Sequence, residues 1–242
     1  MKSENDAIVD YMYNYYKTGR NDSEIISKTE FFTRKPFFFW KDSFGDYMTF
    51  LNQDFGAMAE CGKPVIYLYP EKTTKISVMV GADITKSEPT YGNGWTVTAN
   101  PNGKLVWNGK TFNSLYWEGE GNGIYPEIKS GFVVPTAQIA QTLESQLTQL
   151  GLNEREKADF MAFWLPKMPK TPYTRLTWFG TREMDKMAPL SVSPKPDTTI
   201  RIFLDYAGLS KKIDLKAQQL TKVERVGFTL VEWGGLLRGN LK

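Results

Sequence analysis

The hydrophobic and polar positions of this chain follow a helical period near the N-terminus and a strand period further on. In residues 43–58 apolar side chains recur at three- and four-residue intervals, and residues 3–16 carry a shorter stripe of the same kind. Both segments are therefore predicted to be helices. A second short helix is expected over residues 23–32, after a polar break at 18–22.

The stretch from Cys61 to Glu71, CGKPVIYLYPE, marks the change to β-structure. Val65–Tyr69 combines β-branched, aromatic and aliphatic residues between two prolines, which favours a short strand with defined ends. Both faces of this run are apolar, so we expect a strand that is covered on both sides. Gly62 is expected to end the helix that precedes it.

Short apolar or alternating runs continue to residue 134, separated by turn residues. Asn108-Gly109 between two such runs is a strong hairpin signal. Meanders of this kind form antiparallel sheets or sandwiches. The strands predicted in this region are 65–69, 75–80, 95–99, 104–107, 111–117 and 131–134.

A helical hairpin is predicted next. Pro135–Leu150 carries apolar residues four apart behind a cap at Thr136, and Gly151 is expected to end this helix. Asn153 with Glu156 three residues later forms the capping box of the second helix. In the last third we expect strands at 173–179, 190–193, 199–206, 213–215 and 227–233, and a helix at 181–187.

The predicted fold is α+β, with N-terminal helices, a largely antiparallel β-sheet or sandwich, a helical hairpin and C-terminal strands. Residues 1–60 form the N-terminal helical segment, and residues 61–242 form an α+β domain. The parts of this domain are a β-rich region at 61–134, the helical hairpin at 135–166 and a mixed region at 167–242.

The composition excludes several classes of catalytic site. The 242 residues include no histidine and one cysteine, which excludes Ser-His-Asp and Cys-His catalysis and zinc sites built on histidine or several cysteines. We expect no cofactor and no metal, and a buried thiol at Cys61. A net charge of +3 is too small to indicate nucleic-acid binding.

The apolar segments of the chain bear on where in the cell the protein is located. No run approaches the roughly 20 apolar residues that a transmembrane helix needs, and residues 1–6 do not resemble a signal peptide. We expect a cytoplasmic protein, or a cell-envelope or exported protein if an export segment precedes this sequence.

Three carboxylates are the candidate catalytic groups. Glu118 and Glu120 stand two residues apart at the end of a predicted strand, where they share one face, and Glu232 ends the last strand in a similar Glu-Trp-Gly context. Neighbouring carboxylates can divide acid and base roles. The aromatic residues expected to bind a ligand beside them are Tyr116, Trp117, Trp233 and Trp95.

Two structural alternatives stand beside this pocket. Glu118 and Glu232 could pair with Arg or Lys, or accept backbone N–H bonds in glycine turns, and the acids could instead hold Ca²⁺.

The aromatic stretch Phe31–Trp40 has a basic centre at Arg34 and Lys35. It is either a contact for a membrane surface or single-stranded nucleic acid, or a buried junction with both cations in solvent.

Six short motifs are spread over residues 60–238: Lys63–Glu71, Tyr91–Trp95, Tyr116–Gly119, Gly131–Val134, Phe163–Met168 and Val231–Gly235. Together they resemble those of a family of uncharacterised, mainly bacterial proteins with a KPVIYLYPE signature. The family has no established activity, so the resemblance implies no catalytic residue. Similar proteins often carry a membrane or export segment ahead of the signature.

Three functions are open at this point. The first is a non-catalytic binding domain for a glycan, another cell-envelope ligand or a protein, indicated by the aromatic, turn-rich β-region and the missing histidine. The second is a carboxylate-based, glycosidase-like hydrolase that uses Glu118, Glu120 or Glu232. The third is a structural or interaction protein without a small-molecule site.

Overall fold

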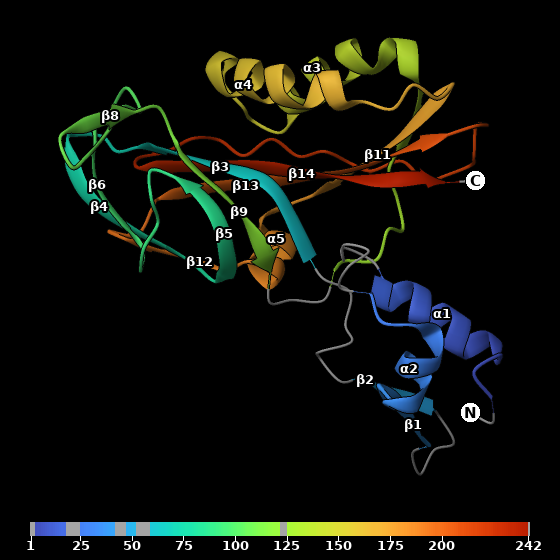
Figure 1. Cartoon of the computed structure of the whole chain (residues 1–242). Coiled ribbons are helices and arrows are strands. Elements are labelled where there is room, and N and C mark those ends of the chain that lie inside the picture. The colour runs from blue at the N-terminus through green and yellow to red at the C-terminus, as the bar shows by residue number, and fades with distance from the viewer. Residues whose placement is uncertain (1–2, 18–24, 42–46, 52–58, 122–124, 242) are drawn as a thin grey trace.

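A computed structural model describes residues 3–17, 25–41, 47–51, 59–121 and 125–241. It confirms an α+β fold in which two β-sheets face each other and helices cover the outer face of the larger sheet (Figure 1). The larger sheet has the order β10-β11-β13-β14-β3-β9-β5. These strands are β10 (Phe132–Pro135), β11 (Tyr173–Phe179), β13 (Thr198–Leu209), β14 (Thr229–Leu241), β3 (Ala59–Tyr69), β9 (Leu115–Gly121) and β5 (Ala82–Glu88).

The smaller sheet is antiparallel and has the order β12-β4-β6-β7-β8. The hairpin between its last two strands turns at Asn108 and Gly109, both with positive φ, as the sequence predicts. Its strands are β12 (Leu190–Ser193), β4 (Thr74–Val80), β6 (Trp95–Ala99), β7 (Leu105–Trp107) and β8 (Lys110–Phe112).

Each face of the larger sheet has its own hydrophobic core. On one face, Val65, Tyr67 and Trp233 pack against α3 (Ile139–Gln149) and α4 (Glu154–Trp164). On the other, Ile66 and Leu68 pack against the smaller sheet and against α5 (Thr181–Met187). The prediction that Val65–Tyr69 is covered on both sides is therefore confirmed.

The larger sheet is antiparallel except at one pair, β13 and β14, which run parallel. Residues 210–228 connect these two strands without forming a helix or strand, so the strand predicted at Ile213–Leu215 is wrong. The connection is held by side-chain bonds instead: Gln218 bonds both the N–H and the C=O of Trp178, each at 2.8 Å. These bonds satisfy backbone groups that a strand would otherwise pair.

The N-terminal unit has its own core and differs from the prediction. It contains α1 (Ala7–Lys17), α2 (Lys28–Thr33) and a hairpin of β1 (Phe37–Lys41) and β2 (Tyr47–Leu51). The helix predicted at residues 43–58 is wrong over β2, while residues 42–46 and 52–58 lie outside the described part. The reason is tertiary, because the aromatic β1 supplies backbone partners to a segment whose Tyr, Thr and Phe residues also suit a strand.

Other predicted boundaries also change. Gly62 does not end a helix but lies inside β3, and β5 was not predicted. Thr136 does not cap α3: it starts a 3₁₀ turn (η3, Thr136–Gln138), and its hydroxyl lies 3.0 Å from that of Thr174. A second 3₁₀ turn, η4 (Leu165–Lys167), follows α4 and contains Pro166.

The aromatic stretch at Phe31–Trp40 is divided between core and solvent. Phe31 and Phe37 are buried in the N-terminal core, whereas Phe38 is 58% exposed. Arg34 and Lys35 are exposed, and Arg34 pairs with Glu30. The prediction of a buried junction with both cations in solvent is therefore confirmed for Phe31, Phe37, Arg34 and Lys35, but not for the exposed Phe38.

The predicted capping box at the start of α4 is confirmed. The side chain of Asn153 accepts a bond from the N–H of Glu156 at 3.0 Å, and Glu156 accepts one from the N–H of Asn153 at 2.9 Å. The amide of Asn153 also donates to the Tyr69 hydroxyl at 3.3 Å. Gly151 ends α3 with a φ of +89°, as predicted.

We expect Asn153→Ala to lower the free energy of unfolding by about 1 kcal/mol, because the first turn of α4 loses its cap. Asn153→Ser should recover most of the loss, since serine restores the cap without the contact to Tyr69. Urea denaturation of the three proteins measures both effects. Equal losses in the two variants would show that the Tyr69 contact matters more than the cap.

Candidate functional site

The candidate pocket requires Trp117-Glu118 and Glu232-Trp233 to lie close together, and the structure brings these two segments together. β3 lies between β9 and β14 in the sheet, and the Nε1 of Trp117 donates to Oε1 of Glu232 at 3.0 Å. Both side chains are completely buried on the face toward the smaller sheet. The meeting point is therefore part of the protein core and has no access for a ligand.

Glu232 has a structural partner as well. Its Oε2 accepts from Nε of Arg201 at 2.6 Å, and both side chains are fully buried. Arg201 also pairs with Asp185 at 2.5 Å and donates to the C=O of Ala188 at 2.7 Å. A buried arginine that satisfies three separate acceptors fixes α5 against β13 and β14, which is the ion-pair alternative foreseen for Glu232.

Glu118 lies on the opposite face of the sheet. Val65 is the register partner of both Tyr116 and Trp233, so these three residues share the face toward α4. Glu118 follows Tyr116 by two positions and accepts a hydrogen bond from its hydroxyl. Glu118 and Glu232 consequently face different sides, and they cannot act on one substrate.

The remaining candidates also separate. Glu120 lies near the end of β9 opposite Asp83 of β5, and is not among the residues that line the cleft described below. Trp95 is 1% exposed in the core between the sheets, where its Nε1 donates to the C=O of Pro89 at 2.8 Å. Of the four predicted aromatic ligand-binding residues, only Tyr116 and Trp233 line the cleft.

An open cleft of about 620 Å³ lies between α4 and the strands β3, β5, β9 and β14. Its lining mixes aromatic rings with groups that can donate or accept hydrogen bonds. The residues that line it are Lys63, Val65, Tyr67, Lys86, Glu88, Asn113, Ser114, Tyr116, Glu118, Asp159, Ala162, Phe163 and Trp233.

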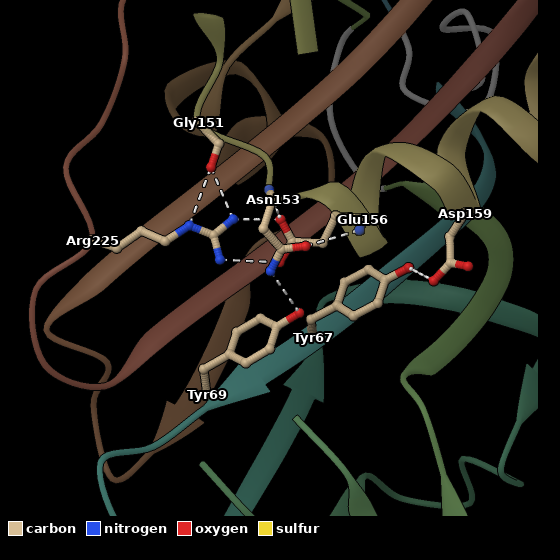
Figure 2. Close-up of polar contacts among 7 residues, drawn as sticks. All are labelled: Tyr67, Tyr69, Gly151, Asn153, Glu156, Asp159 and Arg225. Atoms are coloured by element: carbon tan, nitrogen blue, oxygen red, sulfur yellow. Dashed lines mark hydrogen bonds and ion pairs between the residues drawn. The ribbon is translucent and has the colours of Figure 1, made fainter. Parts of the chain in front are cut away.

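Two tyrosine–carboxylate pairs lie in this cleft. Tyr67 donates to Oδ2 of Asp159 at 2.8 Å (Figure 2), and Tyr116 donates to Glu118. Burial raises the pKa of both tyrosines, and the neighbouring carboxylates raise the pKa further. Both hydroxyls therefore stay protonated at neutral pH and occupy one oxygen of each carboxylate.

The wall formed by α4 is fixed to the sheet by a second set of contacts. Arg225 pairs with the buried carboxylate of Glu156 and donates to the C=O of Gly151 at 2.8 and 3.1 Å (Figure 2). Glu156 also caps α4. Its side chain therefore joins the start of this helix to Arg225, which belongs to the connection between β13 and β14. Asn153 completes the set through its bond to Tyr69.

The glycines after Glu232 have a packing role at the same wall. A Cβ on Gly235 would lie 2.9 Å from both the Trp164 ring and the C=O of Leu204. Glycine is therefore needed for α4 to approach β14 closely.

The indole Nε1 of Trp233 is buried near the Tyr67 hydroxyl, yet it makes no hydrogen bond of normal geometry within the described residues.

Sequence reasoning missed Lys63, Tyr67, Asp159 and Phe163 as cleft residues. A signal existed for Tyr67, because it alternates with Val65 and Tyr69 on one side of the strand. Nothing in the sequence indicated that α4 would lie over this face. Cys61 is in β3, but its side chain lies outside the described part of the structure.

A larger hollow, of about 1170 Å³, lies beside α1 and contains none of the predicted site residues. It is lined by residues of α1 and α5, by 125–130 and by the end of β11. Within the described ranges, no three Cys, Asp or Glu residues are grouped to hold a metal ion. No helix of the described chain has the length and apolar character to span a membrane.

The two predicted acids should differ in their effect on stability. We expect Glu232→Gln to lower the free energy of unfolding by about 3 kcal/mol, because Arg201 loses its fully buried counter-charge and keeps only the half-exposed Asp185. Glu118→Gln, the same change in the open cleft, should alter it by less than about 1 kcal/mol. Urea denaturation compares them, and equal losses would contradict the structural role of Glu232.

The raised pKa of Tyr67 predicts a pH dependence. Above pH 10 the unfolded chain loses the phenolic proton while the folded chain keeps it, so stability should fall as pH rises. Tyr67→Phe removes this contribution, and its unfolding free energy should decline less steeply between pH 9 and 11, by up to roughly 1.4 kcal/mol per pH unit. Identical slopes in urea denaturation would contradict the burial of a protonated hydroxyl.

Comparison with known proteins gives one relative. Over 63 residues the chain is 43% identical to a protein of Butyrivibrio fibrisolvens described as "Uncharacterized protein in bglA 3'region". The aligned part is 24% of this chain, and it spans 66% of the relative's length. No protein-family model matches the chain. No solved structure matches it either.

Proposed function

We propose that this chain is a non-catalytic binding domain whose ligand is a glycan, and that the ligand binds in the cleft beneath α4. The observation that carries the proposal is the lining of this cleft, in which Tyr116 and Phe163 alternate with amide, hydroxyl, ammonium and carboxylate groups. Saccharides offer apolar ring faces and many hydroxyls, and they need this mixture of surfaces. Its volume of about 620 Å³ is within the range of ligand sites.

The separation of the candidate acids supports binding over hydrolysis. Glu232 is committed to Arg201 in the core, so the predicted pair with Glu118 does not exist. A hydrolase would have to use two of the carboxylates that line the cleft, Glu88, Glu118 and Asp159. Glu118 and Asp159 each already accept a hydrogen bond from a tyrosine that stays protonated.

Under this proposal, the residues of the KPVIYLYPE motif have two structural roles. Lys63, Val65 and Tyr67 line the cleft, and Tyr69 holds the start of the helix above it. The alternate positions of the same motif, Ile66 and Leu68, belong to the other core. The motif therefore contributes to both the ligand site and the joining of the two layers.

We expect Tyr116→Ala to weaken glycan binding about tenfold or more, because truncation removes a large ring from the cleft wall. Binding is screened on an array of neutral and acidic cell-wall oligosaccharides, and affinities for the retained sugars are measured by calorimetry. Tyr11→Ala is the matched control, since Tyr11 is 66% exposed on α1 and does not line the cleft.

Failure of every oligosaccharide to bind, or equal effects of Tyr116→Ala and Tyr11→Ala, would contradict the proposal. Mass spectrometry of the incubated sugars tests the hydrolase alternative. Cleavage products that disappear in Glu118→Gln would replace binding with catalysis as the function.

A further inference from the structure

We infer that the cleft recognises an anionic group on its ligand, a carboxylate, sulfate or phosphate, through Lys63 and Lys86. The inference rests on the proposed function, because it names the class of glycan as an acidic saccharide. Its basis is the arrangement of ammonium groups around two of the aromatic rings of the cleft, Tyr116 and Phe163.

Three lysines gather around Tyr116 and Phe163. The Nζ of Lys63 lies 3.7 Å from the centroid of the Phe163 ring and 5.6 Å from that of Tyr116. Lys86 reaches the Tyr116 ring from β5, at 5.8 Å, and Lys167 contacts the Phe163 ring at 3.5 Å. Three like charges at two neighbouring rings repel one another, and a bound anion would offset that repulsion.

The carboxylates that line the cleft, Glu88, Glu118 and Asp159, offset only part of this repulsion. Glu118 and Asp159 accept hydrogen bonds from Tyr116 and Tyr67, and Glu88 is exposed at the rim of the cleft. Neither Lys63 nor Lys86 forms an ion pair with another described residue. Their ammonium groups thus keep donors available for a ligand.

Lys167 differs from the other two lysines. Its Nζ donates to the C=O of Phe163 at 3.1 Å, which fixes it at the end of α4. This bond uses one of its three ammonium donors, but Lys167 is not among the residues that line the cleft, whereas Lys63 and Lys86 are. The direct contacts to an anion are therefore assigned to Lys63 and Lys86.

The backbone places Lys63 in the cleft at a conformational cost. Its φ is +47°, a left-handed conformation that lysine rarely adopts. The ladders on both sides of β3 shift register here, between Cys61 and Val65 toward β9 and between Trp233 and Gly235 toward β14. Bulges and strained residues of this kind are concentrated at functional sites, where they aim a side chain.

Electrostatics agrees with this geometry. Burial lowers the pKa of Lys63, and the nearby charges of Lys167 and Lys86 lower it further against the opposing effect of Glu118 and Asp159. A bound anion would offset both contributions that disfavour the ammonium form.

Sulfate, the smallest probe, tests the subsite directly. The rate of lysine acetylation by an amine-reactive ester is measured residue by residue by mass spectrometry, in sulfate and in chloride at equal ionic strength. We expect sulfate to slow acetylation of Lys63 and Lys86 severalfold and to leave Lys75, exposed on the smaller sheet, unchanged. Equal rates at Lys63 in the two salts would overturn the subsite.

Matched saccharides test the ligand class. An oligogalacturonate should bind at least about tenfold more tightly than its methyl-esterified form, since esterification removes the negative charge and adds only a methyl group at each carboxyl. A chondroitin-sulfate oligosaccharide and a glycerol-phosphate oligomer of wall teichoic acid distinguish carboxylate, sulfate and phosphate as the source. Equal affinity for charged and neutral forms would overturn the inference.

The variants complete the test. Lys63→Met should weaken binding of the preferred acidic oligosaccharide about tenfold, and Lys63→Arg should retain most of the affinity. Lys75→Met is the matched control and should have no effect. Loss of affinity in Lys63→Met together with Lys75→Met would contradict a local site.

The two proposals fail in distinguishable ways. If neutral and acidic glycans bind equally and sulfate gives no protection, the binding function stands and the anion subsite falls. If no glycan binds while sulfate still protects Lys63, the glycan function falls and the anion subsite stands.

Discussion

The alternation of side chains across β9, β3 and β14 is the constraint on which the rest of this structure depends. Because register partners share a face, one set of residues enters the core between the sheets and the other faces α4. A shift of one residue in any of the three strands would exchange the two sets. The cleft exists because Val65, Tyr116 and Trp233 coincide on the helical side.

The same alternation separates the roles of the charged groups. Toward the smaller sheet, charge occurs as closed pairs such as Arg201 with Glu232 and Arg175 with Asp205. In the cleft beneath α4, Asp159 and Glu118 accept hydrogen bonds from tyrosines, and the Lys63 ammonium lies against aromatic rings. Buried pairs of the first kind fix how elements fit together, whereas the second arrangement leaves polar groups at an open cleft, where the proposed ligand would meet them.

Local signals in the sequence were sufficient for much of the fold. The capping box at Asn153, the turn at Asn108 and the strand Tyr173–Phe179 depend on neighbouring residues, and they form as predicted. The segment at Tyr47–Leu51 depends on β1 for its pairing, so its own periodicity was misleading. The candidate site was harder to predict. Whether Glu118 and Glu232 lie on the same face depends on how β9 and β14 pair with β3, and the sequence of one strand alone does not show this pairing.

The position of β14 affects how the molecule can be assembled. This strand is inserted between β13 and β3, and it pairs Trp233 with Val65 from a distant part of the chain. Until it arrives, the sheet remains two separate halves, each with an uncovered hydrogen-bonding edge. Folding during synthesis therefore stays incomplete until the last strand emerges, and in that interval the nascent chain is most exposed to wrong strand pairing and to chaperone capture.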